Sequence, residues 1–476
     1  MAFVELQDHE CAAGAAPPIP LRTHSHSSGR IARRNLHAQF ASLSFRPLYT
    51  FGTLFGYRTS AAIGGRLQPA SPDYGPGPYM WCFSQRRVSE EMENYLDGLR
   101  TWLARSEPLS IPISIRGMRQ GSWLSESSSR STEELLRVAS RWRLLRFATS
   151  APSSLVQRLA GGRFDALEEL VLRYLLLEDS SFDPTNILSF TRAPRLRKLT
   201  VDSACRIPMP WAQLTDVSLT NRASPEVFLD IISQCTNVVR ASVVTTGSSV
   251  FVPARADVVV LDHLRILSIT WSGEEVHHML FLDCLSAPVL DELHLRYYRL
   301  DGDPGLVWSE MTFTAFQLRS PNISKLKMEG DGIAVQYNAL IATLQHAPSL
   351  TDLSVIDCCT NRDALIYALH YTDGIEQPLV PCLHTLALAD VNMTGLYGRW
   401  QDHLPRAFAS RWWTDAELAT RSQTPAVARW RQIRIRDDST RAGFQCSPVF
   451  RRAMEDLRHA GLIVDLVEYG SWNAVW

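Results

Sequence analysis

The side chains best suited to chemistry are paired histidines and paired cysteines, which could bind a metal ion or exchange a disulfide. The histidine pairs are His24-Ser-His26 and His277–His278. A zinc site needs further ligands at a defined spacing, and neither pair has them. Cys358–Cys359 should place one thiol in a core and the other at the surface, without the arrangement that a redox pair needs. We therefore expect no metal site and no cofactor.

Signatures of catalysis are absent from the sequence. It has no Gly-x-x-x-x-Gly-Lys-Ser/Thr phosphate loop, no Gly-x-Ser-x-Gly elbow, no His-Glu-x-x-His motif and no Cys-x-x-Cys pair. The glycine pairs Gly161-Gly162 and Gly75-Pro-Gly77 indicate turns. We therefore expect no catalytic residue and predict that the chain is not an enzyme.

One basic segment near the C-terminus could contact nucleic acid. The segment Arg429–Arg436 contains four arginines and Trp430, a composition found in strands that bind single-stranded nucleic acid. However, Asp437-Asp438 follows directly, and the alternation of arginine with Ile433 and Ile435 is typical of a strand with one solvated face. With a formal net charge of −1 for the chain, we expect no nucleic-acid partner.

A third set of polar residues occupies strand positions that alternate with apolar ones. Alternation points every second side chain away from the core, and neighbouring strands place these side chains next to one another. Their mixture of charges and hydroxyls suits a polar protein partner, the alternative being a solvated face that binds nothing. The candidate partner-binding residues are Glu169, Arg173, Lys198, Asp202, Asp216, Thr270, Glu292, His294, Arg296, Lys325, Lys327, Glu329 and Asp352.

A repeated phrase, Leu-x-x-Leu-x-Leu, defines these strands. The clearest copies start at Leu167, Leu196, Leu264, Leu290, Ile323, Leu350 and Leu383, and weaker ones at Trp142, Leu214, Val238 and Trp430. Successive copies are 25, 29, 18, 24, 26, 26, 33, 27, 33 and 47 residues apart. The central values match leucine-rich repeats, and the longer gaps imply inserted loops. Because one such unit cannot bury its apolar face alone, several units must stack.

Short helical segments precede several phrases and end at a proline. Proline cannot continue a helix and biases the preceding residue to extended geometry, so the chain turns into the next strand. The predicted helical segments are Ile187–Thr191, Phe281–Leu285, Phe313–Leu318 and Leu340–Gln345. The predicted fold is α/β, an irregular leucine-rich-repeat solenoid with a parallel sheet on the concave face and helices on the convex face. One core should bury Leu170, Leu199, Leu267, Leu293, Leu326, Leu353 and Leu386.

Regular elements are also predicted on both sides of the repeats. Before them we expect a helix at Ser89–Arg105, a strand at Pro108–Ile115 and a helix at Ser131–Trp142. After them, Ser447-Pro448 should start a helix that Gly461 ends, and Leu462–Val467 should form a last strand.

The first part of the chain differs in composition from the rest. Between Cys11 and Pro72 there is no acidic residue, and arginine, serine, glycine and proline are frequent. This composition indicates disorder, with a mitochondrial transit peptide or a faulty gene model as alternatives. The predicted domains are a disordered or degenerate segment at 1–78, a cap at 79–141, the solenoid at 142–395 and a C-terminal cap at 396–476.

The composition and the lack of targeting signals limit where in the cell the protein is expected. The nine cysteines are scattered without a paired framework, no secretory signal opens the chain, and no apolar run is long enough to span a membrane. We therefore expect a cytoplasmic and/or nuclear protein with no membrane partner. Lys198, Lys325 and Lys327 are the only lysines.

The sequence resembles a known family in three features. Trp81-Cys-Phe is followed by Leu99-Arg-Thr-Trp-Leu-Ala-Arg-Ser-Glu-Pro-Leu-Ser-Ile111 and then by the helix–Ala-Pro–Leu-x-x-Leu-x-Leu units. From about Tyr79 to the C-terminus this is similar to the large mushroom-fungus family of F-box proteins with leucine-rich-like repeats. In that family an F-box docks a Skp-type linker of a cullin ubiquitin ligase, and the repeats present substrates.

The resemblance implies a non-catalytic adaptor that recognises protein substrates for a cullin-type ubiquitin ligase, with a Skp-type linker as a partner. One feature departs from the family. An F-box opens with a Leu-Pro-x-Glu-Ile/Leu-like phrase, and residues 1–78 contain none. The alternative is a free-standing leucine-rich-repeat binding scaffold with no role in ubiquitin transfer.

Overall fold

A computed structural model of the chain describes most residues after position 78. The described residues are 79–81, 89–116, 126–147, 151–152, 158–159, 161–172, 175–176, 190–202, 208–245, 258–272, 277–298, 305–330, 333–335, 337–358, 362–374, 377–389, 400–436 and 448–467. All of them belong to one compact unit, Tyr74–Trp476. The segment 1–78, for which the sequence predicts disorder, lies outside the described residues.

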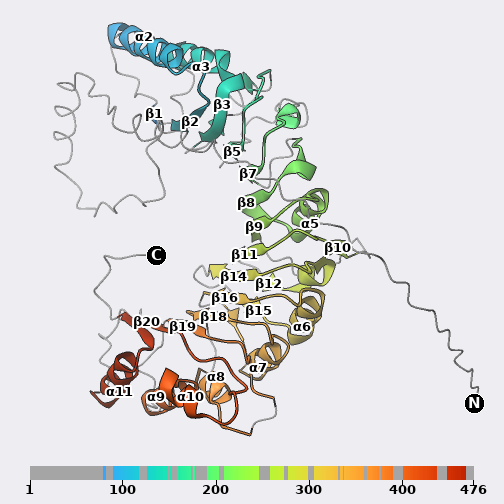
Figure 1. Cartoon of the computed structure of the whole chain (residues 1–476). Helices are drawn as coiled ribbons and strands as arrows, with labels where there is room; N and C mark the ends of the chain where they lie inside the picture. Colours follow the sequence, from blue (N-terminus) through green and yellow to red (C-terminus); the bar gives the residue numbers. More distant parts are fainter. Residues whose placement is uncertain are drawn as a thin grey trace, which may run out of the picture. The chain divides into compact units, whose positions relative to one another are not determined.

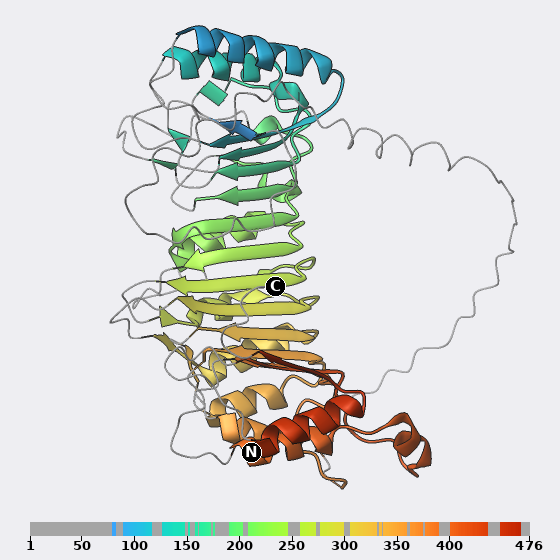
Figure 2. The same cartoon turned by 90° about the vertical axis from the view of Figure 1, so that its left-hand side faces the viewer.

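The unit is organised by one sheet of 14 strands in which every paired neighbour is parallel. Strand order follows chain order throughout, so each unit of the chain lays its strand beside the previous one (Figure 2). The strands are β1 (Tyr79–Trp81), β2 (Ile111–Arg116), β3 (Trp142–Phe147), β5 (Glu169–Leu172), β7 (Lys198–Val201), β8 (Asp216–Ala223), β9 (Arg240–Thr245), β11 (Ile266–Ser272), β14 (Glu292–Tyr298), β16 (Lys325–Glu329), β18 (Asp352–Ile356), β19 (Thr385–Ala389), β20 (Gln432–Arg436) and β21 (Ile463–Val467).

Two-residue strands form three small parallel sheets besides the large one. They are β4 (Ala151–Pro152) with β6 (Leu175–Leu176), β10 (Val259–Val260) with β13 (Leu285–Ser286), and β12 (His277–His278) with β15 (Leu306–Val307) and β17 (Ile333–Ala334). They connect successive units away from the main sheet, so the units that contain these short strands are bonded to their neighbours at more than one level.

Helices connect the strands and cover one side of the sheet. The α-helices are α2 (Ser89–Arg105), α3 (Glu126–Arg137), α5 (Pro225–Gln234), α6 (Glu310–Arg319), α7 (Tyr337–Gln345), α8 (Arg362–Leu369), α9 (Trp400–Ser410), α10 (Asp415–Thr420) and α11 (Pro448–His459). Shorter 3₁₀ turns are η2 (Ala139–Arg141), η4 (Phe190–Arg192), η5 (Trp211–Gln213) and η6 (Leu280–Cys284). Figure 1 shows α5, α6 and α7 on the convex side of the sheet, which leaves the opposite, concave face to the strands. No helix among the described residues combines the length and apolarity needed to cross a membrane.

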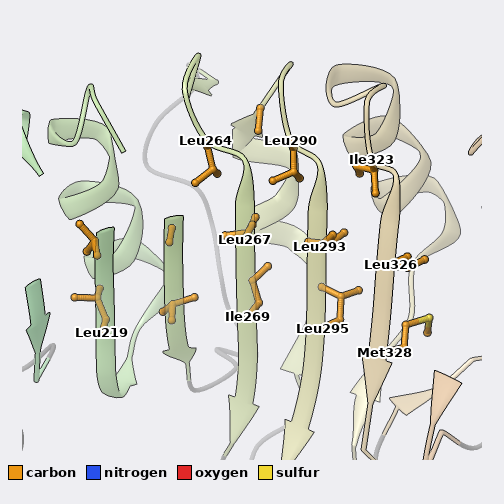
Figure 3. Packing of buried hydrophobic residues seen from close by; sticks show 14 of the residues in the cluster. Leu219, Leu264, Leu267, Ile269, Leu290, Leu293, Leu295, Ile323, Leu326 and Met328 are labelled. Atoms are coloured by element: carbon orange, nitrogen blue, oxygen red, sulfur yellow. The ribbon is translucent and has the colours of Figure 1, made fainter. Parts of the chain in front are cut away.

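The core lies between the sheet and these helices. It contains the seven leucines predicted to be buried, so that prediction is confirmed. Each of the seven is at most 2 % exposed. Their order follows from the register, since Leu267 of β11 pairs with Leu293 of β14, which pairs with Leu326 of β16 (Figure 3). The chain therefore folds as the leucine-rich-repeat solenoid that the phrase predicts.

A ladder of backbone hydrogen bonds aligns the starts of the strands. From Glu168 to His384, the carbonyl of the residue before each strand accepts two successive N–H groups of the next unit. The Arg197 carbonyl accepts from Thr215 and Asp216 at 2.8 and 3.0 Å, and the Thr215 carbonyl accepts from Val239 and Arg240 at 2.7 and 2.9 Å. From β5 to β21 the strands therefore begin at the same level of the sheet, and the side chains just before them form a regular edge.

The sheet continues past the repeats on both sides. β2 pairs with β3 at one end, while β20 and β21 extend the sheet at the other. The predicted helix at Ser89–Arg105 has those bounds, and Gly461 follows α11 with a φ of +100°, as a helix stop requires. The segments that the sequence assigns to two caps thus contribute strands to the same sheet.

Two of the predicted helical segments are 3₁₀ turns instead. Phe281–Leu285 coincides with η6, which is confined between β12 and β13, and the described part of Ile187–Thr191 begins η4. Both β12 and β13 are bonded to neighbouring strands, so the few residues between them can complete only a tight 3₁₀ turn.

Candidate functional site

The register places six of the predicted partner-binding residues in a single line across the concave face. We call this line the charged row, and it also includes Arg240 and Ile266. In strand order it contains Glu169, Lys198, Asp216, Arg240, Ile266, Glu292, Lys325 and Asp352. Apart from Ile266, every neighbour in the row carries the opposite charge. Opposite charges on adjacent strands stabilise a register, so the row supports the stacking of the units.

Most charges on the concave face are paired with one another. Within the charged row, Arg240 Nη1 lies 3.5 Å from Asp216 Oδ1, and Lys325 Nζ donates to Glu292. Glu169 accepts from Arg146 of β3 at 3.2 Å. Among the residues that the structure describes, Lys198 is without an ion pair although its side chain is exposed. The face is thus electrically balanced and offers little long-range attraction to a charged partner.

Arg296, Lys327 and Glu329 form a half-buried ion cluster on β14 and β16. Arg296 Nη2 and Lys327 Nζ lie 2.9 and 3.0 Å from the same oxygen of Glu329, Oε2. Burial alone would raise the pKa of Glu329, but the hydrogen bonds from Lys327 and Arg296 outweigh it and the pKa is lowered. Desolvation lowers the pKa of the adjacent His294 more strongly than Glu292, 3.8 Å away, raises it. His294 is therefore neutral near pH 7.

A strip of short hydroxyl side chains lies beside the charged row. Thr200, Ser218, Ser242 and Ser268 occupy successive strands in register, one outward position further along each strand. Ser268 lies in register with His294 of β14, but no hydrogen bond joins these two side chains among the described residues, so the strip can accept and donate hydrogen bonds and lacks an activated nucleophile.

Three of the predicted partner-binding residues need separate comment. Thr270 is only 6 % exposed, because its short side chain lies in register between Val244 and the much longer side chain of Arg296. Asp202 is 5 % exposed and follows β7, where its N–H still donates to the Leu172 carbonyl at 3.2 Å. Neither side chain is accessible to a partner, which corrects the prediction for both. Arg173 lies outside the described residues.

Changing Glu329 to glutamine should destabilise the protein by about 1 kcal/mol at pH 7. The change removes a carboxylate that two cations share. Since the folded-state pKa of Glu329 lies below its ordinary value of 4.5, its contribution to stability is present above that pH and disappears as the pH falls through the folded-state pKa. Thermal unfolding of both proteins between pH 7 and pH 3 measures this. Glu168→Gln, at an exposed position, is the control and should leave the midpoint unchanged.

A pH-independent difference between native protein and Glu329→Gln would contradict this assignment. It would mean that the side chain contributes by packing and not by its charge.

A groove of about 640 Å³ opens along the edge where the strands begin. Its walls come from the turns before five strands, β7, β8, β9, β11 and β14. The lining residues are Arg197, Gln213, Thr215, Asn237, Val239, Asp262, His263, Arg265 and Val289. None of them is among the residues predicted from the sequence. The one feature of the sequence that could have identified them is position. Arg197, Thr215, Val239 and Arg265 each directly precede a strand.

The described thiols offer no reactive group in either surface. Cys235, Cys284 and Cys358 are buried, and Cys382 is exposed. Burial raises the pKa of Cys235 to about 12, so this thiol is protonated at neutral pH and is a poor nucleophile. In the part of the chain that the structure describes, no three His, Cys, Asp or Glu side chains gather as metal ligands would.

Comparison with known proteins gives similarity to solved structures alone. No family model and no curated protein matches the chain. The leucine-rich repeat-containing protein LegL7 of Legionella pneumophila is similar with 13% identity and a TM-score of 0.31, over 76% of this chain and 94% of that one. An internalin of Listeria monocytogenes, InlF, is similar with 12% identity and a TM-score of 0.24, over 63% of this chain and 92% of that one.

Proposed function

We propose that this chain is a non-catalytic adaptor that binds a protein substrate on the concave face of its sheet and presents it to a cullin-type ubiquitin ligase. The observation that carries the binding role is the register of the concave face. It aligns polar side chains of successive strands in rows over a broad surface that the connecting helices leave open. Such a surface suits a polar protein partner better than a small substrate, which needs an enclosed site.

The ubiquitin role rests on the family resemblance of the region from Tyr79 onward. It requires a Skp-type linker as the second partner and a cytoplasmic or nuclear location. The competing function is a free-standing binding scaffold, which the lack of a Leu-Pro-x-Glu-Ile/Leu-like phrase in residues 1–78 favours. The two differ in one measurable property, the binding of the linker.

Reconstitution with a purified Skp-type linker and its cullin tests the proposal directly. The adaptor function predicts a stable complex of the full chain with the linker on size-exclusion chromatography. A chain that never comigrates with the linker would leave the free-standing scaffold as the function.

In such a reconstituted ligase we expect weak self-ubiquitination, and weaker still with a substrate bound. The three lysines are the only side-chain acceptors besides the N-terminus, and all of them lie on the concave face. Lys325 and Lys327 are 46% and 33% exposed and are paired with Glu292 and Glu329. A bound substrate would cover them. The measurement is a ubiquitination assay of the native chain beside the Lys198→Arg, Lys325→Arg, Lys327→Arg triple variant.

The triple variant keeps the positive charges and is the matched control for modification at the N-terminus. Heavy modification of the native chain that bound substrate does not reduce would contradict the placement of the substrate over the lysines.

A further inference from the structure

The groove at the strand-start edge contains ionisable side chains that make no ion pair with another described residue, whereas most charges on the concave face are paired. Asp262, His263 and Arg265 come from one turn before β11, and no hydrogen bond or ion pair of their side chains exists within the described residues. On the concave face, by contrast, most acids and bases are bonded to each other, for example Glu169 with Arg146 and Glu292 with Lys325. An incoming group can bind the groove without first breaking an internal ion pair, which lowers the cost of recognition.

The walls of the groove are held rigidly by the backbone. The carbonyl of Val239 accepts from Arg265 and Ile266 at 2.8 and 3.1 Å, continuing the ladder that begins at Arg197. The residues before β7, β8, β9 and β11 therefore follow one another at the spacing of neighbouring strands, about 4.8 Å. A regular edge of this kind offers repeated contacts to an extended chain lying along it.

Two amide side chains in the groove have a fixed orientation. Gln213 Nε2 donates to the carbonyls of Ala193 and Leu196 at 2.7 and 3.0 Å, and Asn237 Nδ2 donates to the Ala212 carbonyl at 2.7 Å. Because each amide nitrogen binds the preceding turn, the amide oxygens remain as acceptors. They can bind the backbone N–H groups of a peptide.

Exposed valines border the same groove. Val289 lines it and is 40% exposed, and Val260, 57% exposed, lies two residues before Asp262. β10 pairs with β13 so that Val260 is opposite Ser286, which brings the two valine-bearing segments together. The exposed valines can make apolar contacts with a ligand, and the unpaired charges beside them can orient it, so one site offers both.

We propose that this groove binds an extended acidic segment of a partner protein, with carboxylates on Arg197 and Arg265 and aliphatic side chains on the valines. Two arginines against one aspartate favour an anionic ligand. The Arg265 guanidinium can bind a carboxylate in two-point geometry, whereas Arg197, whose Nη1 donates to the carbonyls of Pro194 and Leu196 at 3.2 and 3.0 Å, offers its remaining N–H groups. The lining contains no Phe, Tyr or Trp on which bases could stack, so the chemistry favours a peptide over a nucleic acid. The site lies at the strand-start edge, where Arg197 and Arg265 directly precede members of the charged row, and it rests on the proposed function only in requiring a protein partner.

Fluorescence anisotropy with the full chain and a labelled synthetic peptide of alternating glutamate and valine tests the proposal. We expect binding that weakens with added salt, and no binding of the corresponding lysine–valine peptide. Arg265→Glu should reduce affinity for the acidic peptide by about tenfold or more. Arg431→Glu is the matched control, because Arg431 holds the same position before β20, outside the groove. It should leave the affinity unchanged.

Three results would overturn the proposal: no binding of the acidic peptide, equal losses with Arg265→Glu and Arg431→Glu, or full displacement of the peptide by a single-stranded oligonucleotide. Linker binding is measured separately in the reconstituted complex. A chain that binds the linker but not the acidic peptide would refute the groove site alone, whereas the reverse would refute the ligase role alone.

Discussion

Replacing Leu293 with alanine should lower the free energy of unfolding by about 2–5 kcal/mol. Leu293 has no exposed surface and lies in register between Leu267 and Leu326, at the centre of the stacked leucines (Figure 3). Truncation removes buried methyl groups and leaves a cavity, since neighbours on both sides are held by the sheet. Denaturant unfolding of the native and variant proteins measures the loss.

Leu318→Ala provides a matched control on the same fold. Leu318 lies on α6 and is 70% exposed, so the identical truncation should change stability by no more than about 0.5 kcal/mol. Each unit contacts chiefly its neighbours, so amide hydrogen exchange in Leu293→Ala should accelerate most over β11, β14 and β16. Equal effects of the two substitutions would show that the phrase does not define the core.

The arrangement of the repeats could be predicted because the determining pattern is local. In Leu290–Leu295 the three apolar positions are spaced so that a strand must turn them to one side, and all three are buried. The pairing of the strands outside the phrases could not be read in this way. Pro108–Ile115 alternates as a strand, but nothing in its residues names β3 as its neighbour. Alternation determines the faces of a strand and leaves its partner open.

The candidate surfaces show the same limit. Glu292 and Lys325 were identified separately as outward strand residues, whereas their ion pair depends on the register between β14 and β16. The groove was missed because the position before the strand has no common chemistry. Arg197, Thr215 and Val239 share only a place in the repeat. The backbone ladder brings these different side chains together, and no pattern of residue types predicts that they lie side by side.

Replacing Arg411 with leucine should destabilise the C-terminal end of the solenoid by about 2–4 kcal/mol. Arg411 follows α9 and is 1% exposed. Its Nη1 and Nη2 donate to the carbonyls of Val380 and Leu379 at 3.3 and 2.7 Å, and its guanidinium lies 5.5 Å from the ring centroid of Trp430. Leucine would leave both buried carbonyls without these donors.

The hydrogen bonds of the Arg411 guanidinium also hold a strained turn. Val380 has a φ of +41°, a left-handed conformation that is unfavourable for a β-branched residue. The backbone carbonyl of Arg411 accepts from Trp430 at 3.1 Å, so one residue joins the end of α9, the turn before β19 and the approach to β20. Burial lowers the pKa of Arg411 to about 10, which leaves the guanidinium charged and fully able to donate at neutral pH.

Two further variants separate the geometry of the guanidinium from its charge. Arg411→Lys keeps the charge, but an ammonium cannot reproduce the planar fork over Trp430, so an intermediate loss is expected. Arg406→Leu, at an exposed position on α9, should change stability by at most about 0.5 kcal/mol. Chemical denaturation ranks the three proteins, and near-ultraviolet circular dichroism reports the packing of the tryptophans. Were Arg411→Leu no worse than Arg406→Leu, the buried cation would have to be dispensable, and packing around Trp430 alone would hold this end together.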